Sequence, residues 1–70
     1  MINIENKIKT VLAISNKTQT EISKDIGMTQ ANFNRKLKNQ TLSLDELEKI
    51  AQAVGAEFNL YFKFPDGNKI

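Results

Sequence analysis

The sequence predicts a mainly α-helical domain that ends in a single β-strand. Apolar residues recur every three or four positions over residues 3–54, which is the period of an amphipathic helix. Capping residues and glycines divide this region into helices expected over residues 3–15, 18–26, 29–38 and 43–54. The period changes to two over residues 57–64, as in a half-buried strand. Because the chain is shorter than the usual domain of about 100–150 residues, we expect one domain over residues 1–70.

The first two helices follow from an apolar stripe and a capping box. The stripe comprises Ile4, Ile8, Val11 and Leu12. After a polar break, the spacing of Thr18 and Glu21 lets each side chain bond the other's backbone amide.

The second helix keeps Ile22 and Ile26 on one face, and Gly27 follows where a left-handed residue is expected. Thr29 then begins a third helix whose apolar residues are Phe33 and Leu37.

The fourth helix has the clearest limits. Ser43 and Glu46 form a second capping box, and the helix stops at Gly55. Its apolar residues are Leu44, Leu47, Ile50, Ala51 and Val54.

Composition excludes several kinds of site. The chain has no Cys and no His, which removes disulfides, thiolate metal sites and the commonest general base. It also has no glycine-rich phosphate loop, so we expect no catalytic residues, no metal and no cofactor. The longest apolar run covers residues 11–14, and the amino end has no apolar stretch typical of a secretory signal. These observations favour a cytoplasmic protein that crosses no membrane.

The second and third segments form a helix-turn-helix candidate. Ser23 is small enough to let the two helices approach, and the third helix presents a polar surface. Glutamine and asparagine can bond adenine in two places, and arginine can do the same to guanine. The net charge of +2 is unevenly spread: residues 29–41 carry Arg35, Lys36 and Lys38 with no acid, whereas residues 42–58 carry four acids and one lysine.

The sequence resembles the Cro/C1-type (XRE) helix-turn-helix family of bacterial and phage regulators over about residues 4–55. The resemblance rests on Thr18-Gln19, Ile22-Ser23, Ile26-Gly27-Met28-Thr29-Gln30, Phe33, Arg35, Ser43-Leu44, Leu47 and Ile50-Ala51. It implies a compact lambda-repressor-like bundle of four or five helices that binds operator DNA as a dimer. It also implies a nucleoid-associated location.

The resemblance implies roles for individual residues. Gln19 corresponds to a glutamine that contacts phosphate and braces the recognition helix, and Gln30 to a glutamine that reads a base. The full set of expected DNA-binding residues is Gln19, Thr29, Gln30, Ala31, Asn32, Asn34, Arg35, Lys38, Asn39 and Thr41. Of these, Ala31, Asn34 and Arg35 match positions that face base edges, and Asn32 matches a position nearer the DNA backbone. The stretch from Lys38 to Thr41 matches a loop that approaches phosphates.

Three residues depart from the family pattern. Ser23 replaces an alanine of similar size, and Ala31 replaces a position that is often polar, so it can touch only a thymine methyl group. Asn39 stands where glycine is frequent, and we expect it to adopt the left-handed conformation of the turn.

The expected strand over residues 57–64 is the most informative feature outside the motif. The turn at residues 65–68 leaves two residues after it, too few for a stable hairpin. One interpretation is a lid over the chain's own core, which leaves both edges of the strand unpaired. The other is antiparallel pairing with a second copy. We expect this homodimer, with Phe58, Leu60, Phe62 and Phe64 as its dimerisation residues.

The sequence therefore predicts a sequence-specific regulator of transcription, a repressor, that binds double-stranded DNA. Its two recognition helices are expected about 34 Å apart, on a pseudo-palindromic operator. Two alternatives stay open. One is the antitoxin of a toxin–antitoxin pair, with a protein toxin as partner, and the other is a protein-interaction module on the same fold that does not bind DNA.

Overall fold

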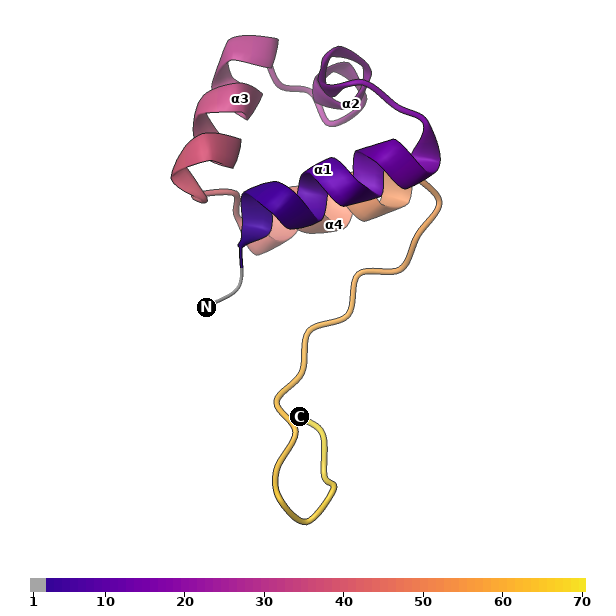
Figure 1. Ribbon diagram of the computed structural model, residues 1–70, viewed down its shortest axis with the longest axis vertical. Helices are drawn as coiled ribbons and strands as arrows, with labels where there is room; N and C mark the ends of the chain where they lie inside the picture. Colours follow the sequence, from indigo (N-terminus) through magenta and orange to yellow (C-terminus); the bar gives the residue numbers. More distant parts are fainter. Residues whose placement is uncertain (1–2) are drawn as a thin grey trace.

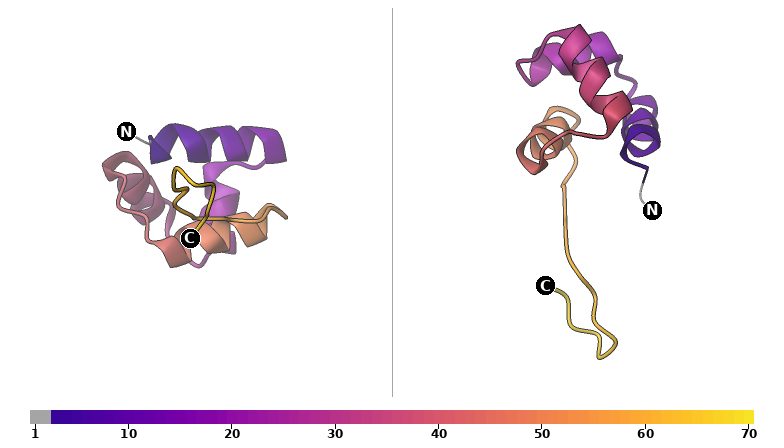
Figure 2. Two further views of the ribbon diagram at one scale, coloured as in Figure 1. Left: turned by 90° about the horizontal axis from the view of Figure 1, so that it is seen from below. Right: turned by 90° about the vertical axis from the view of Figure 1, so that its left-hand side faces the viewer.

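The computed structural model describes residues 3–70, and within them it contains four α-helices (Figure 1). They are α1 (Ile4–Ser15), α2 (Gln19–Asp25), α3 (Gln30–Asn39) and α4 (Leu44–Ala53). α1 and α4 form one layer, and α2 and α3 lie on the side of it that faces away from the carboxy-terminal tail (Figures 1 and 2). The prediction of a mainly α-helical fold is confirmed.

Each helix begins one residue after its expected start, because the expected ranges included the N-cap residue. Both predicted capping boxes are present. Thr18 Oγ1 accepts from the Glu21 amide at 3.1 Å, and Glu21 Oε1 accepts from the Thr18 amide at 3.1 Å. Ser43 and Glu46 make the same pair of bonds at 3.1 and 2.8 Å. These bonds satisfy backbone donors that a helix leaves free at its amino end.

The hydrophobic core lies between the two layers. Its centre is formed by Ile22, Phe33, Leu37 and Ile50, each at most 1 % exposed. These residues come from α2, α3 and α4, and Ile8 and Leu12 of α1 complete the cluster with Ile26. The apolar stripes predicted from the helical period therefore meet in one core.

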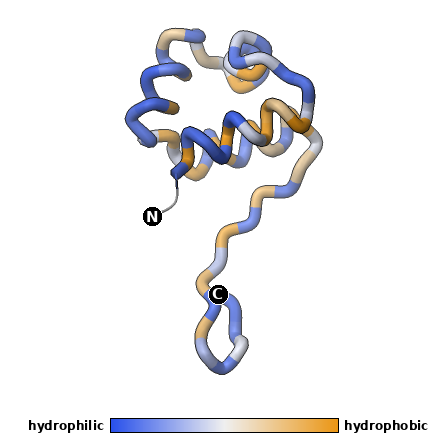
Figure 3. The backbone as a smooth tube through the Cα atoms, in the orientation of Figure 1, coloured by the Kyte–Doolittle hydropathy of each residue, from blue (hydrophilic) through white to orange (hydrophobic). Residues whose placement is uncertain are grey.

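The predicted β-strand over residues 57–64 is wrong for the isolated chain. No strand is assigned within residues 3–70, and the tail leaves the bundle as an extended segment (Figures 1 and 3). Residues 68–70 fold back on it but form no paired strand within residues 3–70, which agrees with the expectation that the return is too short for a stable hairpin. One isolated bridge joins Lys63 and Lys69, with backbone hydrogen bonds between Phe62 and Ile70 and between Phe64 and Asn68. A ladder needs a partner of matching length, and three returning residues supply only one rung.

Candidate nucleic-acid interface

α2 and α3 are joined by a short turn that fixes their angle. Gly27 lies in this turn with a φ of +75°, as the sequence predicted. A Cβ at this position would meet no atom within 4 Å, so the backbone conformation, and not crowding, favours glycine. The Met28 amide donates to the Ser23 carbonyl at 2.8 Å and closes the end of α2. Ser23 is 2 % exposed and its hydroxyl donates to the Thr20 carbonyl, so its polar group is satisfied inside the interface between the helices.

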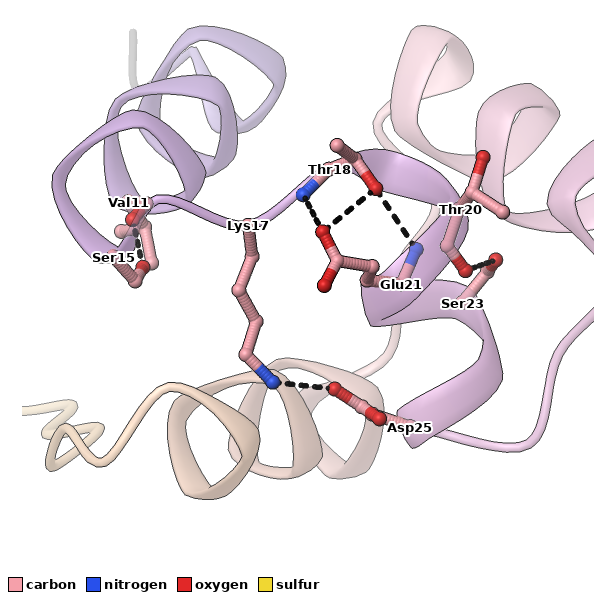
Figure 4. A network of polar contacts seen from close by, with 8 residues as sticks. All are labelled: Val11, Ser15, Lys17, Thr18, Thr20, Glu21, Ser23 and Asp25. Atoms are coloured by element: carbon pink, nitrogen blue, oxygen red, sulfur yellow. Dashed lines mark hydrogen bonds and ion pairs between the residues drawn. The ribbon is translucent and has the colours of Figure 1, made fainter.

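A polar network holds α2 at both of its ends (Figure 4). Thr18 and Glu21 cap the beginning of the helix. Lys17, the residue before this cap, donates to Oδ2 of Asp25, the last residue of α2, at 2.6 Å. α2 is only seven residues long, so such restraints at its ends matter for its position. A fixed α2 in turn gives α3 a fixed base to pack on.

α3 is attached to the bundle by one narrow side. Phe33 and Leu37, one helical turn apart, are fully buried. Arg35 lies on the opposite side of the helix, because two residues correspond to just over half a turn. Ala31 and Lys38 lie on the same outward stripe as Arg35, and all three are exposed. The α2–α3 pair therefore presents a polar, basic helix face to the outside of a packed bundle.

This geometry agrees with a comparison against known families. The family model of the Cro/C1-type HTH DNA-binding domain matches residues 7–58, which include all of α2, α3 and α4 and most of α1. The chain belongs to this family. No curated protein and no solved structure matched it.

As a Cro/C1-type domain, the chain is a DNA-binding module, and its family is not one known for catalysis. Within residues 3–70, no three Asp, Glu, His or Cys side chains gather as metal ligands. In the same part of the chain, every helix is too short or too polar to cross a bilayer.

The amino end of α3 differs electrostatically from the other helices. The first turns of α1, α2 and α4 each contain an acidic residue, whereas that of α3 contains none. Thr29 Oγ1 accepts from the Asn32 amide at 3.2 Å, so Thr29 is the N-cap, and its hydroxyl hydrogen is left to donate elsewhere. Gln30, Ala31 and Asn32 are all exposed in this first turn. The partial positive charge of the helix end is thus not offset by a carboxylate in its own first turn.

Arg35 is oriented by a neighbour on its own helix. One of its guanidinium nitrogens donates to Asn32 Oδ1 at 3.2 Å, across three residues. Both side chains are exposed, and Asn34 beside them is half-buried. This bond was not predicted, although the spacing of Arg35 and Asn32 allows it. The bond points the guanidinium towards the amino half of α3, where Gln30 and Ala31 also lie.

Lys36 belongs to a different side of α3. Its ammonium donates to Glu46 Oε2 at 2.7 Å, which ties α3 to α4. The Lys36 ammonium, and then the Ser43 amide, hold the pKa of the Glu46 carboxyl below its ordinary value, because both donate to the carboxylate. Of the three cations in residues 29–41, Lys36 is therefore paired with an acid on the neighbouring helix. Arg35 and Lys38 are the α3 cations that form no ion pair within residues 3–70.

The end of α3 differs from the prediction in one residue. Asn39 is the last helical residue, and Gln40 adopts the left-handed conformation with a φ of 56°. The expectation of a left-handed Asn39 is wrong, since the helix runs one residue further than expected. Gln40 Oε1 also accepts from the Ile4 amide at 2.7 Å, so it caps α1 and links the two helices. This link spans 36 residues, and no local pattern indicated it.

The remaining predicted residues lie at the start of α2 and at the end of α3. Gln19 is the first residue of α2 and is half-buried. Lys38 and Asn39 are exposed in the last turn of α3, and Thr41 is exposed just after it. The Thr41 amide donates to the Lys36 carbonyl at 2.9 Å, which closes the helix. Contact of any of these residues with DNA stays a prediction.

Proposed function

We propose that this Cro/C1-type chain is a transcriptional repressor that binds a pseudo-palindromic operator in double-stranded DNA as a homodimer. The observation that carries this proposal is the outward stripe of α3. Arg35 lies there opposite the buried Phe33 and Leu37, with Lys38 beside it, and neither cation forms an ion pair within residues 3–70. A helix held from one side and basic on the other fits the major groove of B-DNA.

Their chemistry divides the proposed DNA-binding residues into those that read bases and those that contact the DNA backbone. Arg35 can bond guanine O6 and N7, Gln30 and Asn34 can bond adenine N6 and N7, and Ala31 can touch a thymine methyl group. Phosphates are contacted by cations, hydroxyls and amides. The residues of those types around α3 are Gln19, Thr29, Asn32, Lys38, Asn39 and Thr41.

The dimer is proposed to form through the tail, whose residues Phe58, Leu60, Phe62 and Phe64 are between 39 % and 74 % exposed. The tail lies on the far side of α1 and α4 from α2 and α3, so a contact there leaves the recognition helix accessible (Figures 1 and 2). Such a regulator acts where the chromosome lies, which is the cytoplasm of a bacterial cell. Two subunits related by a two-fold axis read a two-fold sequence, with half-sites one helical turn or a multiple of it apart.

Selection from random duplex DNA with the purified protein tests this function. We expect an enriched pseudo-palindrome, and a reporter gene preceded by it should be repressed when the protein is expressed. Lys38→Ala should weaken binding to the enriched duplex, and Lys9→Ala is its charge-matched control, because Lys9 lies on α1 and pairs with Glu5. Absence of any enriched sequence would refute specific DNA recognition. Enrichment of a single, asymmetric half-site would refute the dimer.

A further inference from the structure

The side of the bundle that faces the tail is apolar and open. A groove of about 580 Å³ lies between α1 and α4. Its walls include Ile8 and Val11 of α1, Leu47 and Ile50 of α4, and Phe58 and Leu60 of the tail itself. Beyond Leu60 the tail leaves the bundle. Leu60 itself is 65 % exposed, and Phe62 and Ile70 are 74 % and 78 % exposed. The apolar alternation of the tail is visible along its length (Figure 3).

The tail also has an unused backbone edge. No backbone hydrogen bond joins residues 57–61 to any other part of the described chain. Phe62 and Phe64 bond inward to the returning residues Ile70 and Asn68. Successive residues of an extended chain direct their backbone groups to opposite edges, so those of Tyr61 and Lys63 point outward. This outer edge can accept another strand.

We propose that the occupant of this edge is the same segment of a second copy, paired antiparallel with the two-fold axis at Leu60. This proposal deepens the homodimer of the proposed function and depends on it. In this register Glu57 lies opposite the partner's Lys63, and the partner's Glu57 lies opposite Lys63. Phe58 lies opposite the partner's Phe62, and the two Leu60 side chains meet at the axis.

Charge complementarity selects this register from its neighbours. With the axis at Asn59 or at Tyr61, Glu57 faces an uncharged residue. With the axis at Lys63, the two lysines face each other, which is destabilising. The axis at Leu60 gives two oppositely charged pairs, and it also agrees with the outward direction of the backbone at Tyr61 and Lys63.

In this pairing, the apolar face of the paired tails lies against the grooves of both bundles. Phe58, Leu60, Phe62 and Phe64 of both copies lie on one face of the ribbon, because side chains alternate between faces. Ile70 joins that face, since it is bonded opposite Phe62. Both bundles therefore cover the same face of the ribbon with their grooves. Because α2 and α3 lie on the side of each bundle away from its tail, both recognition helices are directed away from the ribbon on the same side (Figure 1).

Single cysteines test the register, because the chain has none of its own. In Leu60→Cys the two introduced thiols face each other across a pair without backbone hydrogen bonds, where Cα atoms are about 4.5 Å apart. We expect a disulfide-linked dimer after mild oxidation. In Asn59→Cys and Tyr61→Cys the thiols are diagonal, with Cα atoms about 7–8 Å apart, so cross-linking should be at least about tenfold slower. Equal cross-linking of a control variant would overturn the register. A monomeric mass at micromolar concentration would overturn the pairing and place the tail on its own groove.

A charge exchange tests the complementarity independently. Glu57→Lys and Lys63→Glu should each weaken dimerisation on the order of tenfold by sedimentation, because each change affects two pairs per dimer. The double variant should restore affinity to within about threefold. Both positions are exposed, so circular dichroism is expected to show unchanged helix content. A double variant as weak as the single ones would overturn the proposal.

Binding to the selected duplex, measured beside cross-linking, distinguishes the failure of this proposal from the failure of the proposed function. If two subunits bind a palindrome while Leu60→Cys fails to cross-link, the function stands and the interface is elsewhere. If Leu60→Cys cross-links but no sequence is enriched, the interface stands and the proposed function is refuted.

Discussion

Replacing Glu46 with glutamine should separate two contributions that one carboxylate makes to stability. Glu46 Oε1 accepts from the Ser43 amide at 2.8 Å, and Oε2 accepts from Lys36 at 2.7 Å. A glutamine keeps one oxygen for the Ser43 amide but offers Lys36 an uncharged NH₂ group. Glu46→Gln therefore removes the ion pair and the favourable charge at the start of α4, and it leaves the capping bond.

The magnitude follows from the exposure of the pair. The side chains of Lys36 and Glu46 are 35 % and 17 % exposed, so the pair is partly screened by water. Loss of the pair and of the charge near the helix end should together lower the free energy of unfolding by about 1 kcal/mol. For a domain of this size that corresponds to a fall in Tm of about 4–8 °C. Glu46→Ala should cost about 1 kcal/mol more, because it also loses the capping bond.

The direction of the Glu46 pKa shift determines how the stability difference between the two proteins changes with pH. The pKa of Glu46 is lowered in the folded state, so its contribution is fully present above the ordinary pKa of a glutamate. It is lost as the pH falls through the lowered value, where the carboxyl becomes protonated. Urea unfolding of both proteins between pH 3 and 7 should show the difference at neutral pH and its disappearance in acid. Glu48→Gln, an exposed change on the same helix, is the control. A difference that persists in acid would refute the role of the charge.

Three further predictions concern the recognition helix and its ends. Arg35→Ala should weaken binding to the selected operator by about 1–3 kcal/mol and relax the preference at one position, as measured by competition with single-base variants. Lys38→Ala should weaken binding to all duplexes alike and reduce the slope of log affinity against log salt concentration by about one, which titration at several salt concentrations would show. Unchanged affinity for both variants would contradict the proposal that α3 is the recognition helix. Gly27→Ala should lower stability by about 1 kcal/mol because of its φ of +75°, and a thermal melt equal to the wild type would exclude that strain. Gln40→Ala should cost about 1 kcal/mol, since the Ile4 amide loses its partner, and faster hydrogen exchange at that amide is the specific sign.

The helices and their caps could be predicted because their causes are local. Thr18 and Glu21 are three residues apart, and their mutual bonds follow from that spacing alone. Gly27 follows the last apolar residue of α2, and the chain has to reverse there. The burial of Phe33 and Leu37 follows from the helical period, since no other apolar pair is available on α3 to face the core.

What could not be predicted depends on contacts between distant residues. The bond from Lys36 to Glu46 and that from the Ile4 amide to Gln40 require the angles between helices, which periodicity does not contain. In the tail, by contrast, the local pattern is clear, but the structure depends on a second strand. The alternation does indicate a segment suited to a strand, but a strand also needs a neighbour for its backbone. Within residues 3–70, the isolated chain offers this segment only residues 68–70 as a returning partner, so the preference for a strand is present without the strand itself.

These long-range bonds explain how a helix can be exposed on one side and still hold a fixed position. The flank of α3 that meets α4 is tied by Lys36, its carboxyl end is tied to α1 through Gln40, and its inner side is held by two buried residues. Each restraint uses a side chain that does not point outward along the stripe of Arg35. Because the restraints and the residues proposed to face DNA are different side chains, we expect that recognition can change through Ala31, Asn34 or Arg35 at little cost in stability. The same separation implies that variants of Lys36 or Gln40 weaken DNA binding by displacing α3, and not by removing a contact with a base.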